Sequence, residues 1–213
     1  MTTKALFAFA ALTAVAGLCF GQDQDEEIHH NNITVGGGAA IPAGNSTNYL
    51  STAPLFTVGY GYRFNRWFQA DIGFQAAFGA ANNQNAEVTD FGPVQGGDHE
   101  FMLPIGSRLY IPTRLKRISA SLGAGTAYLH YSETVPSNGF VANNCYSCTS
   151  RGGWGGYGLG NVSYFLDSSH NFRVGTTLQY IAASTNGQAV GNVPALKTTD
   201  HWINLVFEFG LSF

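Results

Sequence analysis

The sequence predicts an all-β fold, a transmembrane antiparallel up-and-down β-barrel of eight strands. Eight segments alternate apolar and polar residues with the period of two that places successive side chains of a strand on opposite faces. The connections between these segments are alternately long and short, as in a barrel with loops at one end and tight turns at the other. Only 11% of the residues are charged, whereas a soluble domain has about 25%.

The first 21 residues predict a secretory signal peptide. Lys4 precedes an apolar run over residues 5–15, and small residues lead to an acidic stretch that begins at Asp23. This order of a positive region, an apolar core and a small-residue site is typical of cleaved signals. We therefore expect residues 1–21 to be removed, with cleavage after Gly21.

The mature chain then divides into a polar N-terminal leader, residues 22–32, and one barrel domain, residues 33–213. A lipoprotein with Cys19 as the lipidated residue is the alternative, which Leu18 disfavours because such signals carry a small residue there. Removal of Lys4 changes the formal charge from −3 to −4, and this mild acidity argues against nucleic acid as a partner. No later stretch approaches the roughly 20 apolar residues of a membrane-spanning helix, so a membrane location requires a closed barrel.

The expected strands are long enough to cross a bilayer. They are the segments 33–41, 55–64, 67–81, 99–111, 118–131, 153–165, 172–183 and 201–213. Ten residues tilted by about 40° rise roughly 25 Å, which is the height of the apolar band on such barrels. The long connections are 42–53, 82–98, 132–152 and 184–200, and the short ones are 65–66, 112–117 and 167–171. Both chain ends then lie at the short-turn end, so the long connections are expected to be extracellular loops.

Residue parity assigns the two faces of most strands. The apolar positions include Phe56, Val58, Tyr60, Tyr62 and Phe64; Phe68, Ala70, Ile72, Phe74 and Phe78; Phe101, Leu103, Ile105, Leu109 and Ile111; Phe172, Val174, Leu178 and Tyr180; and Ile203, Leu205, Phe207, Phe209, Leu211 and Phe213. The glycine-rich segment 153–165 is ambiguous. Aromatic bands are expected at both ends, with Trp202 in the band at the long-loop end.

The charged residues of the expected strands all fall on the polar face. They are Arg63, Asp71, Glu100, Arg108, Arg173 and Glu208. An Arg or Lys facing lipid would cost about 2–4 kcal/mol, and charges inside a narrow barrel must be paired. We therefore expect a lumen charge network that plugs the barrel, with Arg63 and Asp71 as the first pair. Eight strands leave room only for side chains inside, although a narrow ion path is the alternative.

Two cysteines remain after the signal peptide, Cys145 and Cys148. In the oxidising exported compartment a disulfide between them is expected. A zinc site lacks a second pair of ligands nearby, and thioredoxin-type redox chemistry lacks its βαβ setting. No cofactor and no metal are expected.

The final strand, which ends at Phe213, resembles the last strand of bacterial outer-membrane β-barrels, whose terminal aromatic residue is read by the assembly machinery. This resemblance implies a C-terminal insertion signal at Phe209, Leu211 and Phe213, with the barrel-assembly machinery and outer-membrane lipid as partners. Residues 33–213 as a whole resemble the small OmpA/OmpX-like barrels. The resemblance implies a non-enzymatic monomer in the bacterial outer membrane, with a structural or surface-interaction role through its four long loops.

Three other functions are open. A narrow passive, porin-like channel is the first alternative. The stretch His130-Tyr131-Ser132 is similar to the His-x-Ser motif of outer-membrane lipid A deacylases, but Glu133 stands where that family has Asn, and no acid occurs at the family's distance downstream, where Asn143 and Asn144 stand. A soluble ligand-binding barrel of the lipocalin type would place its apolar face inside, which conflicts with the charged alternate face.

Overall fold

The fold is a closed barrel of eight antiparallel strands, as the sequence predicts. The computed structural model describes residues 28–80, 87–89, 92–94, 97–113, 115–136, 145–187 and 197–213. The elements are β1 (Asn31–Pro42), η1 (Gly44–Asn48), β2 (Ala53–Arg63), β3 (Phe68–Phe78), β4 (Glu87–Thr89), β5 (Gly92–Val94), β6 (Gly97–Ile111), β7 (Ile118–Pro136), β8 (Cys145–Phe165), β9 (Phe172–Gly187) and β10 (Lys197–Ser212). Residues 1–21, the expected signal peptide, and residues 22–27 of the expected leader lie outside the described residues.

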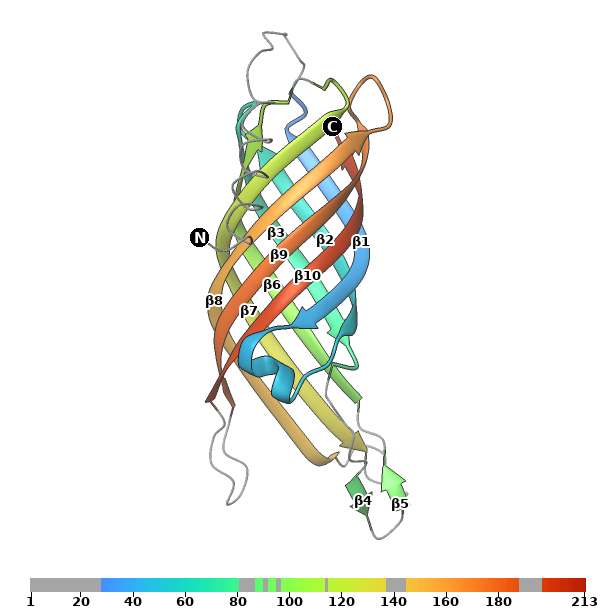
Figure 1. The fold of residues 1–213 in the computed structure, drawn as a ribbon, viewed down its shortest axis with the longest axis vertical. Helices are drawn as coiled ribbons and strands as arrows, with labels where there is room; N and C mark the ends of the chain where they lie inside the picture. Colours follow the sequence, from blue (N-terminus) through green and yellow to red (C-terminus); the bar gives the residue numbers. More distant parts are fainter. Residues whose placement is uncertain are drawn as a thin grey trace, which may run out of the picture.

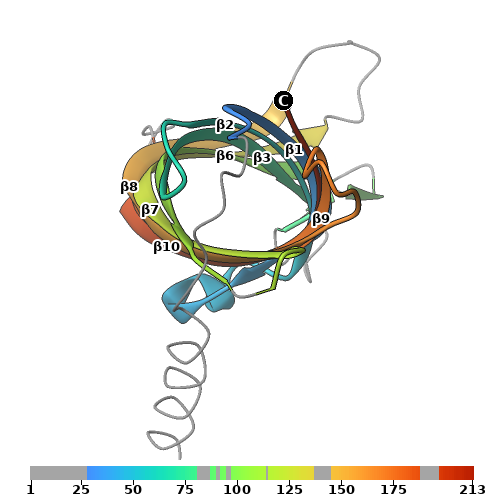
Figure 2. The ribbon, with the colours of Figure 1, turned by 90° about the horizontal axis from the view of Figure 1, so that it is seen from above.

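The strands follow one another around the barrel in the order β1-β10-β9-β8-β7-β6-β3-β2, and β1 pairs with both β2 and β10 to close it. Seen from above, the strands form a closed, flattened ring (Figure 2). The hairpin of β4 and β5 is a separate two-stranded sheet beyond one end of the barrel (Figure 1). Among the described residues, no helix combines the length and apolar content needed to cross a membrane.

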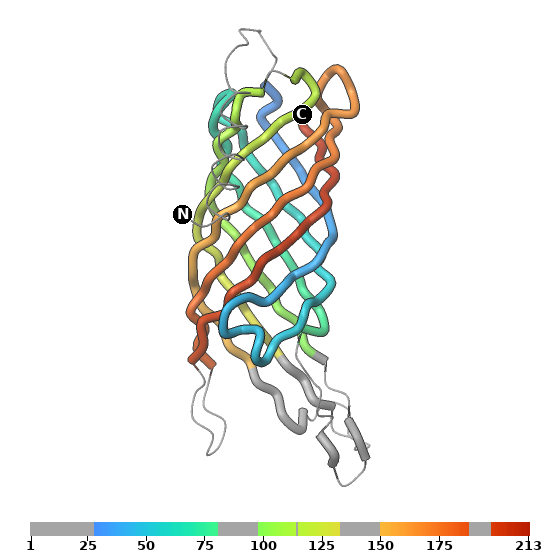
Figure 3. The backbone as a smooth tube through the Cα atoms, in the orientation of Figure 1, coloured from blue at the N-terminus to red at the C-terminus, as the bar shows by residue number. Residues whose placement is uncertain are grey.

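The two ends of the barrel differ, as the connection lengths predict. The short turns between β2 and β3, β6 and β7, and β8 and β9 lie at the end that also holds the C-terminus, which we call the short-turn end. The opposite, long-loop end carries η1 and the hairpin of β4 and β5 (Figure 1). In Figure 3 the strands are strongly tilted against the barrel axis, as closure of a sheet requires.

Several strands run farther toward the long-loop end than the residue pattern suggested. β7 has 19 residues and β8 has 21, and they pair from Ile118 with Tyr164 as far as Pro136 with Cys145. Much of the connection expected over 132–152 is therefore strand. The residues of this connection are polar, as in a loop. Strand pairing nevertheless satisfies the hydrogen bonds of the backbone, which every extended segment must form whatever its side chains.

The outer surface is apolar, whereas the lumen holds polar and charged side chains together with a cluster of apolar ones. Exposed residues include Phe56, Ile72 and Leu109, whereas Gln69, Arg173 and Asn204 are buried. The ambiguous strand β8 follows the same rule, since Trp154 and Val162 lie outside. One prediction was wrong: Trp202 is fully buried in the lumen and does not belong to the outer aromatic band, because it shares the parity of Asn204.

Candidate functional site

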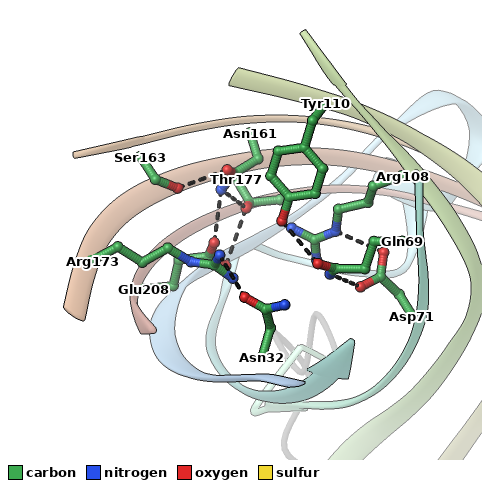
Figure 4. A network of polar contacts seen from close by, with 10 residues as sticks. All are labelled: Asn32, Gln69, Asp71, Arg108, Tyr110, Asn161, Ser163, Arg173, Thr177 and Glu208. Carbon is green, nitrogen blue, oxygen red and sulfur yellow. Dashed lines mark hydrogen bonds and ion pairs between the residues drawn. The ribbon is translucent and has the colours of Figure 1, made fainter. Parts of the chain in front are cut away.

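The short-turn half of the lumen holds a network of polar side chains from six strands. Figure 4 shows its members pointing toward one another: Asn32, Gln69, Asp71, Arg108, Tyr110, Asn161, Ser163, Arg173, Thr177 and Glu208. At its centre Arg108 Nε lies 2.8 Å from Asp71 Oδ2, and both side chains are nearly buried. Gln69 donates a hydrogen bond of 2.6 Å to the other oxygen of Asp71, and Tyr110 donates to Gln69. Both oxygens of this carboxylate therefore have donors.

The second carboxylate of this half, Glu208, is held by neutral donors. Asn161 Nδ2 lies 2.7 Å from one oxygen, and Thr177 Oγ1 lies 3.2 Å from the other. The buried Arg173 donates to the side-chain oxygen of Asn32 at 3.1 Å. These bonds join β1, β8, β9 and β10, so the network links the strands on both sides of the seam between β1 and β10.

Arg63 lies at the short-turn end of the network. Its guanidinium donates to the carbonyl oxygens of Asn65 and Arg66 in the adjacent turn and lies 4.2 Å from the centre of the Tyr110 ring. The sequence favoured Arg63 as the first partner of Asp71. The ion pair that Asp71 forms within 4.0 Å is instead with Arg108, which projects from the next strand, β6.

A layer of amides closes the middle of the lumen. Gln75 Nε2 donates to Gln179 at 2.7 Å, and Asn204 Nδ2 donates to Gln75 at 2.9 Å, with all three side chains buried. Fully buried Met102, Leu129, Ile181 and Trp202 fill the space around and beyond them. On the short-turn side of this layer is a cavity of about 50 Å³, whose wall includes Asp71, Arg108, Arg173 and Glu208. A cavity of this size holds a few water molecules.

A second charged cluster lies in the long-loop half. Arg151 Nε lies 3.1 Å from Asp200, and Tyr49 and Thr185 also donate to the Asp200 carboxylate, at 2.6 and 2.9 Å. The Arg151 guanidinium lies 4.2 Å from the centre of the Tyr131 ring. Burial, followed by the bond to Asp200, raises the pKa of Tyr49. The cluster ties the segment after η1 to the barrel wall.

Sequence reasoning missed Arg151 and Asp200, because both fell in segments expected to be loops. The sequence does contain a pattern that places these two residues in the lumen. Asp200 shares its parity with Trp202 and Asn204, and Arg151 shares its parity with the buried Tyr157. Extension of the period of two beyond the apolar residues would have placed both in the lumen.

Glu100, the remaining member of the predicted lumen charge network, lies in the long-loop half. Its side chain is fully buried, and neither of its carboxylate oxygens has a hydrogen-bond partner of good geometry among the described residues, although the side chain of Trp202 acts on it as a donor. Arg151, Asp200 and Asp98 are the charged groups that act on it. The six predicted charges therefore do not form one network, since Glu100 is separated from the others by the amide layer.

The other predicted site residues are placed as follows. Cys145 and Cys148 are part of β8, but their side chains lie outside the described residues, so the disulfide stays a prediction.

His130 and Ser132 share one face of β7, and the side chain of Glu133 is outside the described part of the chain. Phe213 exchanges two backbone hydrogen bonds of 2.9 Å with Asn31, and Phe209 contacts Phe172 on β9. Within the described part of the chain, no group of three His, Cys, Asp or Glu residues could hold a metal ion.

The barrel, with its apolar exterior and its buried ion pairs and amides, has the fold of outer-membrane β-barrel proteins. No family model and no curated protein matches the sequence. Among solved structures, Neisserial surface protein A has a TM-score of 0.55 and 14% identity, over 86% of this chain and 97% of that one. The N-terminal β-barrel domain of Pseudomonas aeruginosa OprF has a TM-score of 0.50 and 10% identity, over 87% and 98%.

A major outer-membrane protein from Thermus thermophilus also has a TM-score of 0.50 and 10% identity, over 87% of this chain and 100% of that one. At such low identity these similarities establish the fold and no particular activity. They agree with the small outer-membrane barrel architecture predicted from the sequence.

Proposed function

We propose that the protein is an integral protein of the bacterial outer membrane with a structural or surface-interaction role through its long extracellular loops. The distribution of side chains over the barrel wall carries this proposal. Large apolar residues such as Phe56, Leu109 and Phe207 are exposed on the outside, while ion pairs and amides are buried inside. A water-soluble barrel has the opposite arrangement, because exposed apolar surface on this scale is unfavourable in water.

The orientation follows from the unequal ends of the barrel. In membrane barrels of this class the short turns face the periplasm and the longer loops face outward. The barrel is proposed to work as a monomer, because its eight strands pair in a closed circle, so that the barrel wall needs no partner strand to complete it. Phe209, Leu211 and Phe213 are proposed as the signal that the barrel-assembly machinery reads, since Phe209 and Leu211 lie on β10, which closes the barrel, and Phe213 follows it directly.

Epitope insertions test both location and orientation. One epitope is placed between Gly191 and Asn192, in the connection from β9 to β10, and another between Ser168 and Ser169, in the turn from β8 to β9. We expect an antibody to label intact cells that carry the first insertion, and to label the second only after the outer membrane is permeabilised. Labelling of the second insertion alone on intact cells would show that the barrel has the opposite orientation. Recovery of both proteins in the soluble periplasm would refute the proposal.

A narrow passive channel is the second candidate. The cavity beside Arg108 and Glu208 favours it, because an ion path requires water-sized space lined by charged groups. The amide layer of Gln75, Gln179 and Asn204 opposes it, because these buried side chains fill the lumen. Single-channel recording in a planar bilayer decides between the two. Discrete conductance steps support the channel, and silence from correctly folded protein removes it.

A further inference from the structure

The short-turn end carries exposed cations from two neighbouring turns. Arg66 lies between β2 and β3, and Lys116 and Arg117 lie between β6 and β7; all three are exposed. We call these three residues the basic rim. The turns lie side by side, since β3 pairs with β6 and the Tyr110 N–H donates to the Trp67 carbonyl at 2.8 Å. Neither turn contains an Asp or Glu residue.

The adjoining turn contains one acidic residue, Asp167, whose carboxylate is already hydrogen bonded within that turn. Asp167, between β8 and β9, accepts hydrogen bonds from the backbone N–H groups of Phe172 at 2.9 Å and Asn171 at 3.1 Å. These bonds, with that from Phe172 the largest influence, hold the pKa of Asp167 below its usual value. The carboxylate is thus committed to its own turn. The basic rim keeps its positive charge with no acidic residue of its own turns to offset it.

Apolar side chains accompany these cations. Leu115 and Leu166 are about half exposed, and so are Trp67 and Tyr164. The Arg66 guanidinium lies 5.3 Å from the centre of the Trp67 ring, and Arg117 Nη1 donates to the Tyr164 hydroxyl at 3.4 Å. Cations beside exposed leucines and aromatic rings match the chemistry of a membrane interface, where anionic phosphate borders hydrocarbon.

We propose that the basic rim binds the phosphate groups of anionic phospholipids in the leaflet at the short-turn end. This inference rests on the proposed function, because it requires a barrel that crosses a membrane. The neighbouring leucines and Trp67 select a lipid headgroup over free phosphate, since a soluble anion gains nothing from apolar contacts. The site anchors the barrel at a fixed depth through charge as well as through its aromatic residues.

Native mass spectrometry of the detergent-purified barrel tests the site. The probes are dioleoyl phosphatidylglycerol and, for comparison, zwitterionic dioleoyl phosphatidylcholine. We expect preferential retention of phosphatidylglycerol, with an apparent affinity about fivefold lower for each of Arg66→Gln, Lys116→Gln and Arg117→Gln. Lys197→Gln removes an exposed cation at the long-loop end and serves as the matched control, with unchanged retention.

Three outcomes would overturn the inference. They are equal retention of the two lipids, unchanged retention by the variant that lacks all three cations, and equally tight binding of inorganic phosphate. Each protein is first shown to be a folded barrel by the shift in its gel mobility on boiling and by insertion into vesicles. Failure of the wild-type protein in those two assays would count against the proposed function, whereas a folded barrel without lipid preference would refute the basic rim alone.

Discussion

Asp71 on β3 and Arg108 on β6 form an ion pair of 2.8 Å inside the barrel, between strands that are neighbours in the wall. Because both side chains are nearly buried, removal of one partner leaves the other charge uncompensated. Such a loss costs about 3–5 kcal/mol. We expect Arg108→Leu to lower the free energy of unfolding by that amount, measured by denaturant titration in lipid vesicles.

The double variant Asp71→Leu/Arg108→Leu provides the matched comparison. It removes both charges, so we expect it to be more stable than Arg108→Leu alone, with a coupling energy of about 1–3 kcal/mol. Additive effects of the two substitutions would show that the pair does not stabilise the barrel as a unit.

Glu100 and Asp200 are buried acids with different surroundings. Asp200 accepts three hydrogen bonds, whereas neither Glu100 oxygen has a partner of good geometry among the described residues. We expect Asp200→Asn to lower the free energy of unfolding by about 2–4 kcal/mol, and Glu100→Gln to leave it unchanged or raise it. Comparable losses from both substitutions would contradict this asymmetry.

Glycines on adjoining strands should differ sharply in their tolerance of a methyl group. A Cβ atom on Gly125 would lie 2.2 Å from the Ile105 carbonyl oxygen, whereas one on Gly156 would have no atom nearer than 3.7 Å. The clash involves backbone, which cannot move aside cheaply. We expect Gly125→Ala to destabilise the barrel by about 1–3 kcal/mol and Gly156→Ala to change its stability by less than about 0.5 kcal/mol. Equal tolerance would refute the close approach of β6 and β7.

Asp167 should give the turn between β8 and β9 a dependence on pH. Its pKa is lowered in the folded protein, chiefly by the hydrogen bond from Phe172, relative to an ordinary value of 3.8. Its contribution to stability is therefore complete above pH 3.8 and is lost as the pH falls through the folded pKa. We expect Asp167→Ala to lower the unfolding temperature at about pH 7, and we expect this loss to shrink as the pH falls below 3.8. A loss that stays the same as the pH falls would exclude the charge as the cause.

The period of two explains why the strands and their faces could be predicted. It assigns every residue of a strand to one side, so Asp71, Arg108 and Glu208 could be placed inside from sequence alone. Which charges meet could not be predicted, since it depends on the stagger between strands, and this stagger brings Arg108 rather than Arg63 to Asp71. Arg151 and Asp200 were not predicted to lie in the lumen, because the polar residues around them are typical of loops. Their backbones nevertheless pair with neighbouring strands.

Membrane fractionation combined with heat-modifiable gel mobility tests the central claim most directly. We expect the protein to be recovered with the outer membrane, and we expect the unboiled, folded barrel to migrate differently from the boiled chain. This difference arises because a closed strand ladder with a paired lumen resists detergent until it is heated. Recovery in the soluble fraction, with one mobility before and after boiling, would contradict the account.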